Sequence, residues 1–211
     1  MYMSRVLIVF TRNLIKGKVK TRIAKKLGDE TAFAVYRYLL KNIMKLTTNI
    51  KSDIQVSVYY SEFIDKADHW PGNIRKELQK GDDLGTRMGH ALSYEFSHNI
   101  QQVCIIGSDV FNLDESIIHS AFDLLSSHDV VIGPASDGGY YLLGTNNYHK
   151  ELFEGFNWGS NSILSDTIKR IESLAMGYVL LPELNDVDEV QDIPAEIVNK
   201  IKQNTNDTEA S

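Results

Sequence analysis

The sequence predicts an α/β fold in which helices cover both sides of a mainly parallel sheet. Two observations support this prediction. Continuous apolar runs such as Val6–Phe10 and Val103–Ile106 are typical of strands buried on both faces, as in parallel sheets. These runs alternate with longer segments of helical periodicity, and that alternation indicates βαβ units with right-handed crossovers. At 211 residues, the chain suits one domain with a single substantial core.

The first third of the chain contains two strands and one helix in this prediction. The strand Val6–Phe10 is followed by a polar loop, Thr11–Lys20, around Gly17. A helix begins at Asp29, where apolar residues recur at spacings of three and four through Met44. The segment Ile54–Tyr60 alternates enough to be a strand, and Trp70–Asn73 breaks the chain.

The middle of the chain repeats the strand and helix pattern. A helix over Leu84–Phe96 is entered through the Gly81-Asp82-Asp83 turn, and the strand Val103–Ile106 follows. Asp114 caps a helix that runs to Leu125, because a carboxylate at this position accepts from free N–H groups of the first turn. Asp129–Ile132 is the next strand.

The last third is predicted to complete the sheet. Tyr140–Leu143 follows its neighbour too closely for a helical crossover, so we expect this strand to be antiparallel. Ser160 or Asn161 caps a helix through Leu174, and Tyr178–Leu181 is the final strand. A last helix covers Glu189–Ile201. The domain therefore spans residues 1–202, and residues 203–211 form a flexible tail with almost no apolar content.

Composition limits the classes of function. The net charge of −6 argues against a broad nucleic-acid surface, so no nucleic-acid partner is expected. Cys104 is the only cysteine and lies in an apolar strand, which favours a packing role and excludes an internal disulfide. The longest apolar run near the start is too short for a membrane span, so we expect a cytoplasmic protein.

Charge is distributed unevenly along the chain. Residues 1–28 hold eight Lys or Arg and no Asp or Glu, whereas six acidic residues cluster between Glu183 and Glu196. A cationic and an anionic element in one small domain suit a ligand made of phosphate and metal. Two solvated faces are the alternative interpretation.

Asp109 is a candidate metal ligand. The strand Val103–Ile106 leads directly into Gly107-Ser108-Asp109, and ligands of open α/β sheets bind outside the carboxyl ends of the strands. Hard cations such as Mg²⁺ take one or two carboxylates plus substrate phosphates. In the alternative reading, Asp109 or Ser108 only caps local N–H groups.

The loop after the first strand could hold the phosphate. Between Arg12 and Arg22 it combines Lys and Arg side chains with Gly17, although the glycine spacing of a P-loop is absent. A basic surface loop without a ligand is the alternative.

Two further motifs also allow two interpretations. Asp137-Gly138-Gly139 permits close backbone approach to a ligand but would also make a hairpin turn. Asp186 and Asp188 share a face if the segment is extended, and Asp188 could instead be a helix cap.

The order of these motifs is more specific than any one of them. Val19-Lys20-Thr21-Arg22, Gly107-Ser108-Asp109, Asp137 to Gly144 and Asp186-Val187-Asp188 together resemble an uncharacterised bacterial family described as glycosyltransferase-like. This family belongs to the nucleotide-diphospho-sugar transferase superfamily, and the similarity covers about residues 5–195. The chain is more distantly similar to 2-phospholactate and molybdenum-cofactor guanylyltransferases. The resemblance implies a single-domain GT-A fold, a three-layer α/β/α sandwich with a mainly parallel mixed sheet.

The resemblance also implies roles for individual residues. A divalent ion, Mg²⁺ or Mn²⁺, would be held by Asp109 and Asp188, and Asp109 and Asp137 would be catalytic. The expected nucleotide- and phosphate-binding residues are Arg12, Gly17, Lys20, Arg22, Gly81, Asp83, Gly85 and Arg87. The expected substrate residues are Gly138, Gly139, Tyr140, Trp158 and Ser160.

Two segments depart from the family pattern. Asn13–Lys16 stands where the family usually has two prolines, and Val110-Phe111 replaces the usual Cys-Pro. The leading hypothesis is a metal-dependent glycosyltransferase that uses a nucleotide-diphosphate-sugar donor and an unidentified acceptor. The alternatives are a nucleotidyltransferase that releases pyrophosphate and a catalytically silent nucleotide-binding module. The sequence gives no indication of the oligomeric state.

Overall fold

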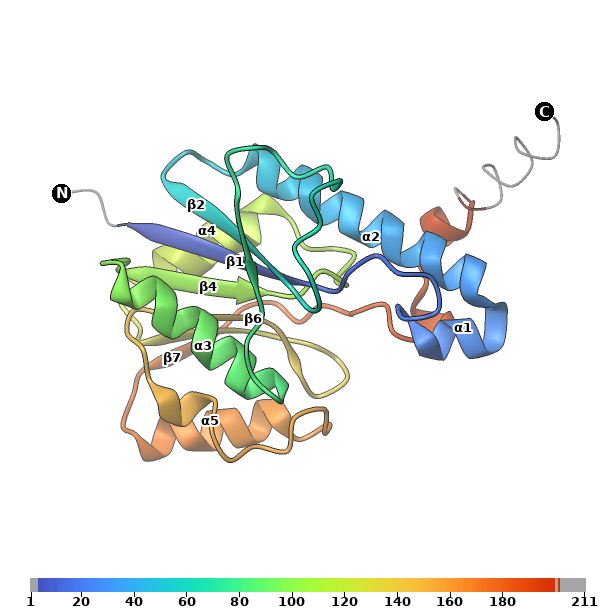
Figure 1. Cartoon of the computed structure of the whole chain (residues 1–211). Coiled ribbons are helices and arrows are strands. Elements are labelled where there is room, and N and C mark those ends of the chain that lie inside the picture. The colour runs from blue at the N-terminus through green and yellow to red at the C-terminus, as the bar shows by residue number, and fades with distance from the viewer. Residues whose placement is uncertain (1–3, 200, 202–211) are drawn as a thin grey trace, which may run out of the picture.

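A seven-stranded sheet forms the centre of the protein in a computed structural model, which describes residues 4–199 and 201 (Figure 1). The strand order is β3-β2-β1-β4-β6-β5-β7. Only β6 runs antiparallel to its neighbours β4 and β5, and every other pairing is parallel. The strands are β1 (Arg5–Thr11), β2 (Ile54–Tyr60), β3 (Arg75–Leu78), β4 (Gln102–Ile106), β5 (Val130–Pro134), β6 (Tyr140–Thr145) and β7 (Tyr178–Leu180).

Helices cover both faces of this sheet, which gives three layers. One core packs α2 (Asp29–Asn49) and α4 (Glu115–Leu124) against one face, and a second core packs α3 (Leu84–Ser97) and α5 (Ile163–Ser173) against the other (Figure 1). Residues of β1 and β4 alternate between the two cores, so both faces of these strands are buried. This double burial explains why their sequences are continuously apolar.

The fold class and most elements are predicted correctly from the sequence. The mainly parallel mixed sheet, the antiparallel β6 and the Asp114 cap of α4 are all confirmed, the last by a 3.0 Å bond from the amide of Ile117. Buried Cys104 packs in the core as expected. One strand and one α-helix were not predicted: the edge strand β3, whose sequence is short and charged, and α1 (Thr21–Leu27), which follows the basic loop.

The last two predicted helices differ from the structure. Neither Ser160 nor Asn161 caps α5, because the chain makes a further turn and Ser162 occupies that position. The predicted helix Glu189–Ile201 is interrupted: a short 3₁₀ turn, η2 (Val190–Asp192), precedes a helix that begins at Ala195. Pro194 accounts for the break, since a residue before proline is forced into extended conformation, and Ile193 has ψ of 114°. A second 3₁₀ turn, η1 (Lys150–Leu152), follows β6. The predicted tail, 203–211, lies outside the described residues.

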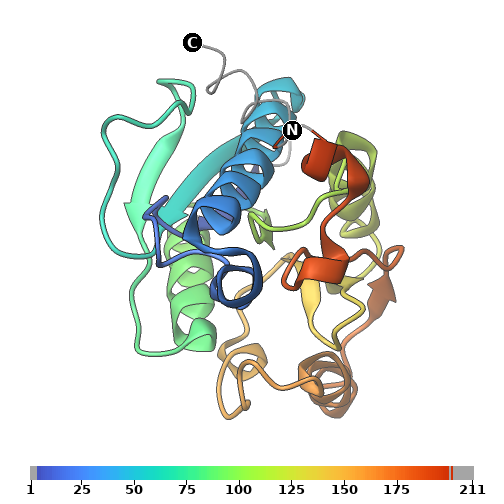
Figure 2. The same ribbon diagram turned by 90° about the vertical axis from the view of Figure 1, so that its right-hand side faces the viewer.

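Many of the predicted site residues lie where the parallel strands end. Figure 2 views this carboxyl edge, where the loop after β1 and α1 lies beside the segment that follows β7. Because β6 is antiparallel, its first residue, Tyr140, lies at this same edge. The sheet topology therefore brings together loops from distant parts of the sequence.

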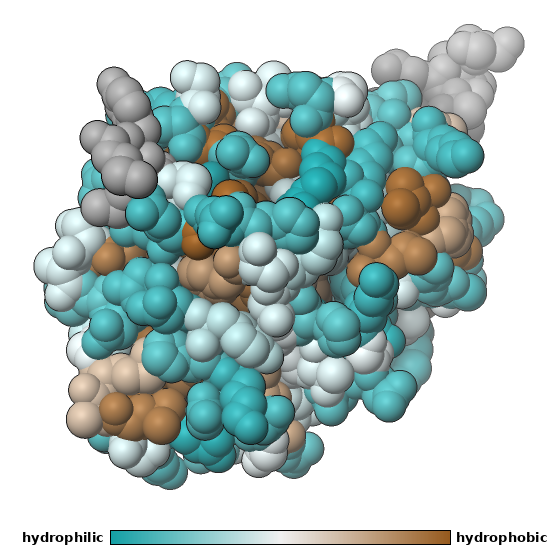
Figure 3. Space-filling model, turned by 60° about the vertical axis from the view of Figure 1, so that its left-hand side comes forward, coloured by the Kyte–Doolittle hydropathy of each residue, from teal (hydrophilic) through white to brown (hydrophobic). Residues whose placement is uncertain are grey.

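Among the helices of the described residues, none is both long and apolar enough to cross a bilayer. The face turned forward in Figure 3 is mainly hydrophilic, with apolar side chains in small separate groups.

Candidate active site

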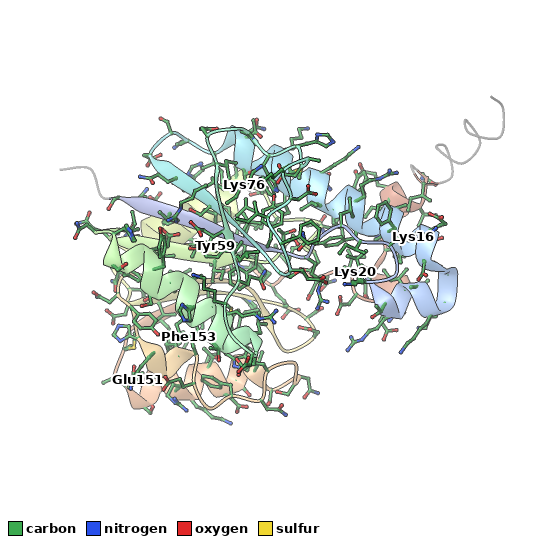
Figure 4. All side chains as sticks on the ribbon, in the orientation of Figure 1. Lys16, Lys20, Tyr59, Lys76, Glu151 and Phe153 are labelled. Atoms are coloured by element: carbon green, nitrogen blue, oxygen red, sulfur yellow. The ribbon has the colours of Figure 1, made fainter. Side chains whose placement is uncertain are left out.

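The loops at the carboxyl edge enclose a cleft of about 760 Å³. Its wall includes the start of the basic loop, the turn before α3 and the end of β4. Lys20, Asp109 and Asp188, which lie far apart in the sequence, all line this cleft. Figure 4 places Lys20 between the end of β1 and α1.

Lys20 bridges the two predicted metal ligands. Its Nζ lies 3.0 Å from Oδ2 of Asp109 and 2.8 Å from Oδ1 of Asp188. The Lys20 side chain is only 5% exposed, whereas the two carboxylates keep 38% and 44% of their areas exposed. Arg22 adds a longer ion pair of 3.5 Å to Asp188. One oxygen of Asp109 and one oxygen of Asp188 therefore face the same position, which a single small cation can reach.

Backbone pairing fixes this arrangement. Val110 and Asp186 form an isolated antiparallel bridge, and the amide of Val187 donates to the carbonyl of Asp109 at 3.1 Å. This bridge ties the segment after β7 to the end of β4. Lys20 is held in the left-handed region, with φ of 46°, immediately before α1. A residue with a Cβ is uncommon there, and such strain persists only where surrounding contacts impose it.

The electrostatics of the cluster follow from these contacts. Burial disfavours the charged form of Lys20, but Asp109 and Asp188 outweigh it and raise the pKa of the ammonium above its ordinary value. Burial also opposes ionisation of Asp109, yet Lys20 outweighs it and lowers the pKa of that carboxyl. For Asp186 the shift is in the opposite direction: burial, and then the charge of Asp137, raises its pKa to about 6.

The Tyr36 hydroxyl is a buried hydrogen-bonding centre behind the cleft. It lies 2.8 Å from Oγ of Ser108 and 3.1 Å from Oγ1 of Thr11, and accepts from the amide of Arg12 at 2.9 Å. This hydroxyl therefore joins α2 to the ends of β1 and β4, next to Asp109. Tyr36 was not predicted as a site residue, because its position within the apolar stripe of a helix reads as core.

A second cavity, of about 340 Å³, adjoins the first. Asp137, Gly139, Trp158 and Ser160 line it, and Arg22, Leu84, Tyr140 and Asp186 lie in the walls of both cavities. The Trp158 and Tyr140 rings meet edge to face, with centroids 6.5 Å apart. The predicted substrate residues thus gather beside the predicted phosphate-binding residues, with Arg22 at the junction.

Several predicted glycines act within the protein rather than in a cavity wall. A Cβ at Gly85 would collide with the indole of Trp158, and one at Gly138, where φ is 88°, would collide with the carbonyl of Asn161. Gly17 makes a turn with φ of 80°. The carbonyl of Gly81 accepts from Nε of Arg87 at 2.8 Å. Packing and turn geometry are enough to explain why glycine occupies these positions.

The structure divides the predicted site residues into three groups. The first cleft is lined by Arg12, Lys20, Arg22, Asp83, Arg87, Asp109, Tyr140 and Asp188. The second cavity is lined by Arg22, Asp137, Gly139, Tyr140, Trp158 and Ser160. Neither wall includes Gly17, Gly81, Gly85 or Gly138.

Other cleft residues were not predicted. Gln79, Glu62 and Asp82 come from the irregular segments around β3, an element that the sequence does not reveal. Lys18 belongs to the predicted basic loop and also lines the cleft. Asp186 forms an alternating acidic pair with Asp188 in the sequence, and this alternation could have identified it as a cleft residue.

Comparisons with known proteins agree with this architecture. A family described as "Uncharacterized protein conserved in bacteria (DUF2064)" matches residues 44–160, more than half of the chain, and the protein belongs to this family. No curated protein matches the sequence significantly.

Solved structures show the same fold. A protein from Desulfovibrio desulfuricans G20, described as a "putative nucleotide-diphospho-sugar transferase", shares 29% identity with a TM-score of 0.81 over 90% of this chain and 85% of its own. The inositol-1-phosphate CTP transferase of T. maritima is 12% identical, with a TM-score of 0.52 over 96% and 97% of the two chains. Rv0371c of Mycobacterium tuberculosis H37Rv, solved with manganese, is 10% identical, with a TM-score of 0.55 over 89% and 95%. The protein therefore has the nucleotide-diphospho-sugar transferase fold.

Proposed function

We propose that this member of the DUF2064 family is a metal-dependent glycosyltransferase that uses a nucleotide-diphosphate-sugar donor. The observation that carries the proposal is the pair Asp109 and Asp188, brought onto one cationic atom at the carboxyl edge of the sheet. Similarity to the Desulfovibrio protein, whose description names a nucleotide-diphospho-sugar transferase, supports the same class of reaction.

The two carboxylates fit a divalent metal ion. Among the described residues, no group of three or more His, Cys, Asp or Glu side chains could enclose one. A pair of carboxylates completed by phosphates and water is the usual arrangement for Mg²⁺ in nucleotide sites, and Mn²⁺ accepts similar oxygen ligands. When bound, the ion would neutralise charge that develops on the departing diphosphate.

The residues of the chain supply the remaining functions. Lys20 and Arg22 are placed to pair with diphosphate oxygens, Lys20 as a point charge and Arg22 as a planar fork. The nucleoside would extend toward the turn before α3, where Asp83 and Arg87 line the cleft. Asp137 in the second cavity is the candidate base for an acceptor hydroxyl, and one of its oxygens already accepts from the amide of Gly139 at 2.8 Å.

The second cavity favours a sugar over a phosphorylated acceptor. Carboxylates of Asp137 and Asp186 and the aromatic side chain of Trp158 lie in its wall. Sugar hydroxyls donate to carboxylates, whereas a phosphate would be repelled by them. One observation favours nucleotidyl transfer instead: Arg22 lies at the junction of both cavities, where a cation could hold the phosphate of an acceptor.

A binding panel tests the proposed function. Nucleotides and nucleotide sugars are added separately, with and without Mg²⁺ or Mn²⁺, and the thermal midpoint is followed, because ligands of the native state stabilise it. We expect a metal-dependent shift with at least one nucleotide sugar, and absence of any shift would contradict both enzymatic readings. Free nucleoside diphosphate among the products indicates glycosyl transfer, and pyrophosphate indicates nucleotidyl transfer.

Two variants sharpen this test. Asp109→Asn should abolish the metal-dependent part of the shift, because an amide is a weaker ligand for a hard cation. Asp114→Asn is a matched control nearby that removes the same charge and leaves a good helix cap. Metal-dependent binding that survives Asp109→Asn would refute the metal assignment.

A further inference from the structure

Lys20 lies where cation binding is expected. Its Nζ contacts both candidate metal ligands within 3.0 Å, and its side chain is almost completely buried. A lysine ammonium and a divalent ion that approach the same carboxylate oxygens repel each other and compete for the same lone pairs. The Lys20 ammonium and a divalent ion therefore cannot contact Asp109 and Asp188 in this way at the same time.

The position of Lys20 is imposed by the chain around it. The residue has a left-handed backbone conformation, and the next turn of α1 is tied to the segment after β7. Arg22 pairs with Asp188, and Nζ of Lys26 lies 2.9 Å from Oε2 of Glu189. Ile23 packs with Val187 in one apolar cluster. The packing of α1 against the segment after β7 therefore fixes the backbone of Lys20 and directs its ammonium toward the two carboxylates.

We infer that Lys20 is the internal counter-cation of the ligand-free site, so that it suppresses metal binding until a diphosphate offers its ammonium another partner. This inference rests on the proposed function, which takes Asp109 and Asp188 as metal ligands. Lysine is a point charge on a flexible stem, so its ammonium can transfer from carboxylate to phosphate oxygens without movement of the backbone. Metal and nucleotide then bind cooperatively, and the protein alone binds the metal weakly.

The test measures Mn²⁺ binding by the full chain without nucleotide. Loss of the electron paramagnetic resonance signal of free Mn²⁺ reports the bound fraction. We expect Lys20→Met to bind Mn²⁺ at least about tenfold more tightly than the unaltered protein, because a unit positive charge is removed from contact with the ligands. Lys20→Arg keeps the charge and should bind as weakly as the unaltered protein.

Lys18 provides a matched control. It belongs to the same loop and lines the same cleft, but its side chain is 57% exposed and pairs with Glu62 at 2.8 Å. Lys18→Met removes the same charge without touching either aspartate, so its affinity for Mn²⁺ should remain within about twofold, given screening at the surface. Equal tightening in Lys18→Met and Lys20→Met would overturn the inference, as would no tightening in Lys20→Met.

Further measurements locate the ion and guard against misfolding. Adding Asp109→Asn to Lys20→Met should remove the tightened binding, and its persistence would overturn the inference because the ion would then lie elsewhere. Mn²⁺ should also raise the thermal midpoint of Lys20→Met more than that of the unaltered protein. If Lys20→Met does not fold, the ¹⁵N signal of the Lys20 ammonium, assigned through Lys20→Arg, is followed in the unaltered protein. Equimolar Mn²⁺ should leave this signal sharp, and broadening would overturn the inference.

These outcomes are separate from those of the proposed function. The Mn²⁺ measurement uses the metal alone, whereas the binding panel uses nucleotides and nucleotide sugars. A panel that succeeds while Lys20→Met shows no tightening rejects only the role of Lys20. A panel without any shift rejects the proposed function, whatever the Mn²⁺ measurement gives.

Discussion

Gly85→Ala directly tests the close contact between α3 and Trp158 where the two cavities adjoin. Gly85 lies in the first turn of α3, beside the part of the cleft proposed to hold the nucleoside, and Trp158 lines the second cavity. A Cβ at Gly85 would come closer than 3.0 Å to Nε1 and Cε2 of Trp158 and to the carbonyl oxygen of Phe153. Ordinary carbon contacts are about 3.5–4.0 Å, so the indole must move.

The magnitude follows from two opposed effects. In an unobstructed helix interior, replacing Gly by Ala gains about 1 kcal/mol. Overpacking against a rigid neighbour costs about 1–3 kcal/mol, and here one of the three obstructing atoms belongs to the backbone. We therefore expect Gly85→Ala to be destabilised by up to about 2 kcal/mol, despite its better helix propensity.

The assay combines denaturant unfolding with tryptophan fluorescence. The protein has two tryptophans, and Trp70 is buried in the other core, so a Trp70→Phe background isolates the emission of Trp158. Displacement of the indole should alter this emission in Gly85→Ala. Binding in the second cavity should weaken more than binding of the nucleotide alone.

Gly89→Ala, one turn later in α3, is the control. Its added Cβ would lie 3.3 Å from Cβ of Phe153, so a few tenths of an ångström of movement is enough. We expect a smaller stability change than at Gly85 and no change in Trp158 emission. Stabilisation of Gly85→Ala by the full propensity gain, with unchanged Trp158 emission, would refute the predicted collision with the indole.

Three further changes have defined outcomes. Gly138→Ala should cost about 1–3 kcal/mol in denaturant unfolding, since Gly138 has φ of 88° and faces the Asn161 carbonyl, and no loss would contradict this geometry. Hydrogen bonds from Ser116 and the Ile117 amide lower the pKa of Asp114, so its contribution is complete above the unfolded value of about 3.9 and is lost as pH falls through the lower folded value. Asp114→Ala should therefore cost about 1 kcal/mol at pH 7 and almost nothing in acid, as a pH series of unfolding curves would measure. Glu95→Ala should cost about 2–4 kcal/mol in thermal or denaturant unfolding, because buried Glu95 partners Arg75 and Tyr59, and a cost below about 1 kcal/mol would refute that estimate.

Most of the strands could be predicted because burial determines their composition, whereas their order in the sheet comes from the structure. β1 and β4 are buried on both faces and read as apolar runs, and the close spacing of β5 and β6 revealed the antiparallel strand. β3 could not be predicted in the same way. It is an edge strand of four residues, Arg75–Leu78, whose charged side chains do not report its pairing with β2.

The candidate site was predicted in part for a similar reason. Acidic and basic residues at strand ends carry a visible chemical signal, and the structure brings Lys20, Asp109 and Asp188 together as expected from their order. Glycines are ambiguous, because a Cβ is excluded equally by a ligand and by a protein neighbour. Gly85 and Gly138 face Trp158 and Asn161, and no property of the linear sequence distinguishes these neighbours from a bound molecule.

The location of Lys20 shows why the two candidate metal ligands stand out in the sequence while their environment does not. Each aspartate follows from the strand or segment that ends beside it, which is a local property. The Lys20 contact instead depends on the Val110–Asp186 bridge and on the packing of α1, which join residues 20, 109 and 188 through three separate parts of the chain. The sequence predicts that Lys20 binds phosphate, but in the structure its ammonium is already paired with Asp109 and Asp188. Under the proposed function, the affinity of Lys20 for phosphate would include the cost of leaving two carboxylates, and metal binding would offset that cost by restoring their neutralisation.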